Sequence, residues 1–219
     1  MNISFLCSNT QHPVNEYLQH WINLNKHNHQ VELVRDKNEL TGGELLFLIS
    51  CSQIIDSQDR AKYSHTLVLH ASDLPRGRGW SPYIWEIING ANKITVTLLE
   101  AEDEIDSGRV WGKRQLPLTP DMLWYEINAQ LFAAELELVD YAIANYSTIK
   151  PEEQTSTIEP SYYPKRTPKD SQIDPQKSIA EQFNTIRVCD PKRFPAYFEL
   201  HGQRYNIILE KVNDDSTGH

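Results

Sequence analysis

The chain has 219 residues, with 21 Lys and Arg against 30 Asp and Glu, which gives a formal net charge of −9. A protein that clamps a nucleic acid needs clustered cations to neutralise phosphates, so this balance argues against a polyanion as the main partner. The apolar runs are far too short to span a bilayer, and the first residues lack the basic and apolar regions of a signal peptide. Three widely spaced cysteines, Cys7, Cys51 and Cys189, have no zinc spacing and favour a reducing, cytoplasmic compartment.

Predicted strands and helices alternate in the first part of the chain. Apolar periodicity predicts a helix over residues 12–26, and a short polar helix or loop is expected over 52–62. Short apolar runs predict strands over 3–7, 30–34, 43–51, 66–69 and 93–100. This alternation indicates an α/β protein with a Rossmann-like, mostly parallel sheet. In such sheets ligands bind beyond the carboxyl ends of the strands.

Two further helices are expected after residue 80. Ser81 and Pro82 predict a capped start and a first-turn proline for a helix that ends at Asn89-Gly90. The segment Thr119-Pro120-Asp121 predicts the start of the longest helix, which continues to about Asn145.

The composition changes after the longest helix. Residues 148–176 hold five of the twelve prolines and little apolar periodicity, so they form a linker or an extended segment that wraps the core. A short helix over 178–188 and a β-hairpin turning at His201-Gly202-Gln203, with a second strand over 205–211, follow. We therefore expect a catalytic domain over 1–147, a Pro-rich linker over 148–176 and a small helix-and-hairpin subdomain over 177–219.

A histidine and an aspartate lie in two loops that follow predicted strands. The apolar run Leu67–Leu69 leads directly to His70, and a loop rich in Ser, Pro and Gly follows. Asp106 comes before Ser107 and Gly108 in the second loop. A lone histidine at a strand end is usually structural. A base at the mouth of a strand, with a carboxylate from another loop to orient it, suits acyl transfer.

The motif His-x-Ser-x-Leu-Pro, followed at this separation by Asp-x-Gly, resembles the 10-formyltetrahydrofolate-dependent formyltransferase family. The matching core covers about residues 64–112, and a weaker match runs through 166–212. The resemblance implies the formyltransferase fold, N10-formyltetrahydrofolate as co-substrate and no metal. It implies that His70 is the base or proton shuttle for an attacking amine and supports the oxyanion. Asp106 is implied to hold the His70 ring in the productive tautomer.

The resemblance also implies where the folate binds. Ser72, Leu74 and Pro75 match a turn that lines the folate tail and the formyl site. The second loop is implied to wrap the pterin ring, largely through backbone groups, which makes cofactor-binding candidates of Glu102, Ile105 and Gly108. The alternatives are an ordinary tight turn and a solvated acidic loop.

The residues after the first loop are candidates for substrate binding. Arg76, Arg78 and Gly79 could cradle a diphosphate, because glycine admits close backbone approach and arginine supplies charge-assisted donors. A solvated loop explains the same residues equally well. Trp80 could form the floor of the substrate pocket or belong to the core.

One position departs from the family pattern. The family usually has an asparagine two residues before the histidine as a donor to the oxyanion, whereas this chain has Val68. Ser52 or Cys51, at the end of the preceding apolar strand, could supply a donor if that strand is adjacent, as could a backbone N–H or a water molecule. The substitution leaves open a slow, redirected or inactive enzyme.

Residues 166–170 and 202–205 most resemble the nucleotide-sugar N-formyltransferase branch. That branch implies formyl transfer to the amino group, at C4, of a UDP- or dTDP-linked deoxysugar for surface-glycan biosynthesis. It also implies a homodimer, for which the hairpin is a candidate interface. The charge and the short C-terminal region disfavour a methionyl-tRNA enzyme. The remaining alternatives are a formyltetrahydrofolate hydrolase, a purine-type formyltransferase and a non-catalytic folate or sugar binder.

Overall fold

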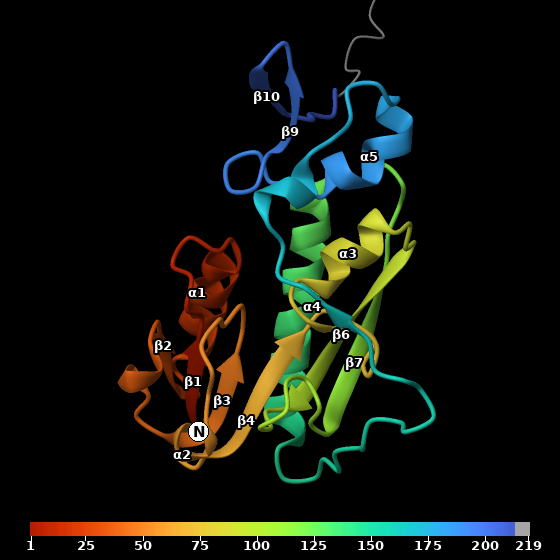
Figure 1. Cartoon of the computed structure of the whole chain (residues 1–219). Helices are drawn as coiled ribbons and strands as arrows, with labels where there is room; N and C mark the ends of the chain where they lie inside the picture. The colour runs from red at the N-terminus through yellow and green to blue at the C-terminus, as the bar shows by residue number, and fades with distance from the viewer. Residues whose placement is uncertain (213–219) are drawn as a thin grey trace, which may run out of the picture.

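The computed structural model describes residues 1–212 and is built around a six-stranded sheet with the strand order β2-β1-β3-β4-β6-β7 (Figure 1). Four neighbouring strands are parallel: β2 (Gln30–Val34), β1 (Asn2–Leu6), β3 (Gly43–Leu48) and β4 (Tyr63–His70). The last two are antiparallel additions, β6 (Lys93–Glu100) beside β4 and β7 (Val110–Pro117) beside β6. The predicted mostly parallel, Rossmann-like α/β sheet is confirmed.

Strand β7 was not expected from the sequence. Its residues, Val-Trp-Gly-Lys-Arg-Gln-Leu-Pro, place two adjacent cations in the middle of the strand, which hides the apolar alternation. The strand forms because β6 is available to pair with it along nearly its whole length. Edge strands commonly carry such charges, since they discourage pairing with other chains.

The helices are α1 (Val14–Asn25), α2 (Ser57–Arg60), α3 (Pro82–Ile88), α4 (Trp124–Asn145) and α5 (Ile179–Arg187). Two short 3₁₀ helices, η1 (Lys37–Glu39) and η2 (Pro168–Ser171), complete the helical elements of the described residues. α1 forms as its pattern predicts, because Val14, Leu18, Trp21 and Ile22 lie on one buried face.

Three predictions about the ends of strands and helices are wrong. β3 ends at Leu48 rather than at Cys51, since Ser50 adopts a left-handed conformation with φ +50°. Ser81 is also left-handed and its side chain makes no cap, although Pro82 does lie in the first turn of α3. α4 begins at Trp124 rather than at residues 119–121.

The core lies mainly between the sheet and the helices α1 and α4. It includes Phe5, Phe47, Leu67 and Leu98 from the strands and Leu138 from α4, all fully buried. A smaller apolar cluster covers the opposite face of the sheet. Alternate residues of β4 therefore face different clusters, which fixes where the side chains at its carboxyl end point.

A two-stranded hairpin, β9 (Ala196–Leu200) and β10 (Gln203–Ile207), lies at one end of the molecule, away from β1 and β2 (Figure 1). His201 and Gly202 form its turn, both with positive φ, which is the geometry of a type I′ hairpin turn. The predicted hairpin and the α5 helix before it are confirmed, although β10 starts at Gln203 and ends at Ile207, short of the expected Lys211. Residues 213–219 of the predicted C-terminal subdomain lie outside the described residues.

The segment from 150 to 165, which we call the strap, crosses in front of the sheet (Figure 1). Its strand β8 (Tyr162–Tyr163) pairs in parallel with β5 (Arg78–Gly79), and Glu152 forms a bridge with Val110 of β7. The Trp85 indole donates to the Pro164 carbonyl at 3.1 Å. These bonds favour a segment that wraps the core over a free linker. The division into three parts at 147 and 176 stays a prediction.

Candidate active site

His70 is the last residue of β4, at the carboxyl edge of the parallel strands, and its side chain is buried. Its ring is held between two loops. The Nε2 atom lies 2.8 Å from the Gly77 carbonyl oxygen, and the Nδ1 atom lies 3.6 Å from Oδ1 of Asp106. The two ring nitrogens therefore face different loops, Nε2 the loop after β4 and Nδ1 the loop between β6 and β7.

Asp106 reaches His70 from the loop between β6 and β7. Its backbone is left-handed, with φ +54°, and its carboxylate is nearly as buried as the imidazole. The second carboxylate oxygen, Oδ2, accepts a hydrogen bond from the Gly79 N–H at 2.8 Å. The structure therefore brings the two predicted catalytic residues together, while their roles stay predictions.

The turn after His70 is anchored by two residues that the sequence did not indicate. Thr97 lies opposite His70 on β6, and its hydroxyl donates to the Ser72 carbonyl at 2.7 Å. Lys113 of β7 donates to the Leu74 carbonyl at 2.7 Å and forms an ion pair with Asp73 at 2.6 Å. Only the alternation of apolar and polar residues along β7 could have indicated that Lys113 faces this turn. The adjacent cations Lys113 and Arg114 hide that alternation.

Ser72 and Gly77 pack closely inside this turn. A Cβ atom at Gly77, which has φ +74°, would lie 2.9 Å from Cβ of Ser72 and 3.3 Å from Oε1 of Glu86. The Ser72 hydroxyl is buried and has no hydrogen-bond partner within residues 1–212. Burial, with the negative charge of Asp73, raises the pKa of Glu86 to about 7.

The other folate candidates lie on the loop between β6 and β7. Gly108 is buried, and a Cβ atom there would come within 2.0 Å of the Glu100 carbonyl oxygen, so no larger residue fits without a shift. Glu102 is exposed, and the Ile105 side chain is 63% exposed. Leu74 and Pro75, from the first loop, are buried.

The substrate candidates differ in their surroundings. Arg76 is exposed, whereas the buried Arg78 guanidinium pairs with Glu104 at 2.6 Å and bonds the Tyr162 hydroxyl and the Gln154 side-chain oxygen. Trp80 is partly exposed, and Nζ of Lys165 lies 4.9 Å from the centre of its ring. The diphosphate cradle stays a prediction, and Arg78 already has internal partners.

Val68 lies beside the strand that was expected to carry a substitute donor. β3 is adjacent to β4, with Leu48 beside Val68, so the strand expected to carry a substitute donor is in the right place. Cys51 packs in the same apolar cluster as Val68. Ser52 is bonded to the Ser8 hydroxyl through its own N–H. No group among these is assigned as the oxyanion donor.

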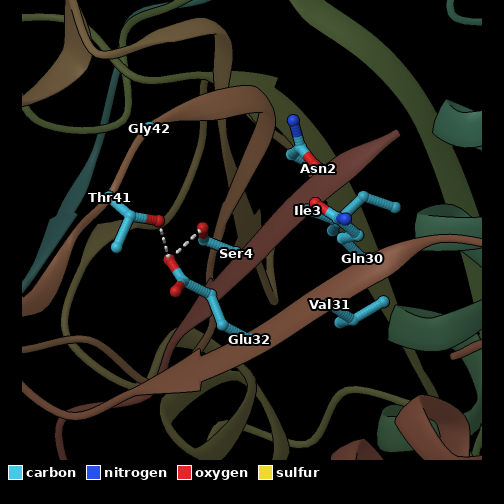
Figure 2. Close-up of a pocket in the computed structure, with 8 residues that line it drawn as sticks. All are labelled: Asn2, Ile3, Ser4, Gln30, Val31, Glu32, Thr41 and Gly42. Atoms are coloured by element: carbon cyan, nitrogen blue, oxygen red, sulfur yellow. Dashed lines mark hydrogen bonds between the residues drawn. The ribbon is translucent and has the colours of Figure 1, made fainter.

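A pocket lies at the amino ends of β1 and β2, at the end of the parallel strands opposite to His70 (Figure 2). There, Oε1 of Glu32 accepts hydrogen bonds from the hydroxyls of Ser4 at 2.6 Å and Thr41 at 3.0 Å. Because the parallel strands all run away from this end, the pocket is separate from His70 and its loops.

A histidine beside a carboxylate, at the carboxyl edge of an α/β sheet, is an arrangement suited to acyl transfer. The chain belongs to the formyl transferase family, whose profile matches residues 2–143. This is the family that the motifs around His70 and Asp106 resemble.

Curated relatives include the methionyl-tRNA formyltransferases of Lactococcus lactis, 31% identical over 152 residues, and Streptococcus pneumoniae, 31% identical over 159 residues. The matches cover 68% and 71% of this chain but 47% and 49% of the relatives. The chain thus spans about half the length of these proteins. Their names do not confirm the nucleotide-sugar branch.

Solved structures show the same fold. Methionyl-tRNA formyltransferase from Clostridium thermocellum has a TM-score of 0.79 at 21% identity, covering 98% of this chain and 95% of that one. HypX from Aquifex aeolicus in complex with tetrahydrofolic acid scores 0.77 at 24% identity, covering 92% and 36%. A 4-N formyltransferase from Francisella tularensis scores 0.71 at 18% identity, covering 96% and 98%. The predicted formyltransferase fold is confirmed.

Proposed function

We propose that this protein transfers the formyl group of N10-formyltetrahydrofolate to an amine. The observation that carries the proposal is the buried pair of His70 and Asp106, 3.6 Å apart at the carboxyl edge of the sheet, on the two loops that carry the family motifs. A general base oriented by a carboxylate is the arrangement that amine acylation requires.

The proposed reaction forms one bond and breaks one. The acceptor nitrogen attacks the formyl carbon, His70 takes a proton from that nitrogen, and the proton passes to N10 as the bond between N10 and the formyl carbon breaks. Asp106 stabilises the imidazolium that forms on the way. The chemistry needs no metal.

The two loops suit a folate. Gly108 lets the backbone of the second loop approach Glu100 closely, and Ile105 on the same loop exposes an apolar side chain that is available to a pterin ring. The Ser72 hydroxyl is fully buried and lacks a partner within residues 1–212, so it can bond a polar group of the co-substrate only if the turn after His70 moves. A structural relative, HypX, is known in complex with tetrahydrofolic acid.

For the acceptor we propose the amino group, at C4, of a UDP- or dTDP-linked amino deoxysugar destined for a surface glycan. The net charge of −9 disfavours a tRNA, which would need many phosphate contacts. A nucleotide sugar needs few cations, and the exposed Arg76 together with Lys165 over Trp80 can supply them. The 4-N formyltransferase of Francisella tularensis shares the fold over nearly the full length of both chains.

The test is a turnover assay. Purified protein is mixed with N10-formyltetrahydrofolate and a panel of UDP- and dTDP-linked 4-amino sugars, with methionyl-tRNA and glycinamide ribonucleotide as competing acceptors. A sugar product heavier by one formyl group in place of a hydrogen supports the proposal. Free formate alone would indicate a hydrolase, a formylated tRNA or ribonucleotide another branch, and folate binding without turnover a binding protein.

We also propose that the protein is a homodimer that assembles through the C-terminal hairpin and works in the cytoplasm. The hairpin and the chain beside it expose large apolar side chains, among them Phe194, Leu200, Tyr205 and Ile208. Within residues 1–212, no helix combines the length and the apolar character needed to cross a membrane.

A further inference from the structure

One side chain of the strap joins the two loops of the candidate site. The Gln154 amide nitrogen donates to the backbone carbonyls of Asp106 at 2.8 Å and Gly108 at 2.9 Å. Its side-chain oxygen accepts a hydrogen bond from Arg78 at 3.0 Å. The amide nitrogen therefore binds the loop after β6, and the amide oxygen binds Arg78, which follows β4.

Asp106 needs such support because its backbone is left-handed, a conformation that residues with a Cβ atom rarely adopt. Gln154 holds its carbonyl, and the N–H of Gly79 holds its carboxylate. Gly79 directly follows Arg78, which itself binds Gln154. These neighbouring contacts therefore fix both the carboxylate and the backbone carbonyl of Asp106.

Arg78 forms the other half of this connection. Its guanidinium is buried, pairs with Glu104 at 2.6 Å and bonds the Tyr162 hydroxyl at 3.1 Å. Glu104 lies on the same loop as Asp106, and Tyr162 lies on the strap. The guanidinium thus ties the strap to both loops instead of facing outward as a diphosphate ligand would.

We propose that Gln154, supported by Arg78, is a positioning residue that holds the Asp106 carboxylate against His70. This inference rests on the proposed function. Gln154 acts through Asp106, and its bonds fix the place of the carboxylate in the site. Losing them lets the loop move, and a displacement of about 1 Å at a reacting group can lower turnover about 100-fold.

Two variants distinguish the hydrogen bonds that Gln154 donates to the loop carbonyls from the one that it accepts from Arg78. Gln154→Ala removes every bond, whereas Gln154→Glu keeps an acceptor for Arg78 but loses both donors to the loop carbonyls. We expect kcat to fall about 10- to 100-fold in both, with the KM of the acceptor nearly unchanged. Thr155→Ala is the matched control, because its hydroxyl bonds Thr157 within the strap, and it should keep wild-type kinetics.

The Asp106→Asn background supplies the decisive comparison. If Gln154 acts through the Asp106 carboxylate, Gln154→Ala should cost little further activity once that carboxylate has been replaced. Full additivity of the two losses would overturn the proposal, as would a wild-type kcat in Gln154→Glu. A lower melting temperature with unchanged kcat would show a structural role alone.

Amide hydrogen exchange keeps this test independent of turnover. Residues 104–108 should exchange faster in Gln154→Ala than in the wild type or in Thr155→Ala, because the loop loses two hydrogen bonds. If the wild type transfers no formyl group, the proposed function fails while exchange still tests the positioning role. Unchanged exchange in a protein that does turn over would overturn the positioning role alone.

Discussion

Apolar side chains are usually buried and polar side chains exposed. The body of the molecule, meaning the sheet with its helices, loops and strap, departs from this pattern in one way, and the C-terminal hairpin departs from it in the opposite way. The body buries polar side chains, including His70, Arg78 and Glu135, whereas the hairpin region exposes Leu200 and Ile208. Burying a polar group costs free energy unless it is paired, and clustered exposed apolar groups mark contact surfaces. Each region therefore carries a feature that folding alone does not explain, which the proposed chemistry accounts for in the body and the proposed dimer accounts for at the hairpin.

The two regions also differ in where their contacts come from. The partners of His70 and Arg78 come from loops and a strap distant in the sequence. The two strands of the hairpin pair locally, since the turn at His201-Gly202 sets their register, and Tyr197 also ties the first strand to Ile173 by a backbone hydrogen bond. We therefore expect substitutions in the body to affect activity and stability together, and substitutions in the hairpin to stay local.

The largest expected effect is that of His70→Asn. Removing the base should lower kcat about 10²- to 10⁴-fold while folate binding, measured by titration calorimetry, is nearly retained. His201→Asn is the matched control at the hairpin turn, where asparagine tolerates the positive φ of residue 201. An unchanged kcat in His70→Asn would remove the catalytic assignment.

A second test concerns Glu135, which α4 buries and which has one carboxylate oxygen without a hydrogen-bond partner in the described residues. Burial raises its pKa to about 8, from an ordinary value of 4.5. Between these values the folded state keeps a proton that the unfolded state has lost. This contribution to stability is complete below the lower pKa and disappears as the pH rises through the higher one.

Glu135→Gln should therefore flatten the fall in unfolding free energy between about pH 5 and pH 9, and at about pH 9 should be more stable than the wild type by roughly 2–4 kcal/mol. Urea denaturation at the two pH values measures this difference. Glu199→Gln, at an exposed ion pair of the hairpin, should keep the wild-type slope. An equal slope in both variants would contradict the assignment of a protonated Glu135.

Two glycines offer a smaller contrast. Gly108→Ala places a Cβ atom within 2.0 Å of the Glu100 carbonyl and should cost about 1–3 kcal/mol of stability and lower kcat, because the Asp106 loop must move. Gly202→Ala meets no atom within 4 Å and has only the strain of φ +74°, about 1 kcal/mol, with kcat unchanged. Chemical denaturation and turnover assays of both variants would show whether the loop and the hairpin respond differently.

Local pattern was enough to predict the parallel strands, α1, α5 and the hairpin. The motifs around His70 and Asp106 also predicted two residues that the structure brings together. The anchors contributed by Thr97, Lys113 and Gln154 could not be predicted, because each depends on long-range contacts. Lys113 required β7, whose charges hid its period, and Gln154 required the path of a proline-rich segment.

The left-handed residues Ser50 and Ser81 show the same limit at element boundaries. Serine is a common cap and turn residue, so its local preference predicted a helix cap at Ser81. The chain instead turns sharply there to place Gly79 beside Asp106 and Trp80 beside the strap. The tertiary contacts of the site outweigh the local preference, which is common where a structure serves function.

The smallest expected effect on stability is at the hairpin. Leu200→Glu with Ile208→Glu should leave the unfolding free energy of the monomer within about 0.5 kcal/mol, because both side chains are already exposed. The same change should convert the proposed dimer to a monomer in analytical ultracentrifugation, since charges would replace the apolar surface. Leu24→Glu is the matched control, because Leu24 is an exposed apolar residue of α1 outside the hairpin. A wild-type monomer, or equal dimerisation in all variants, would show that the exposed hairpin has a role other than assembly.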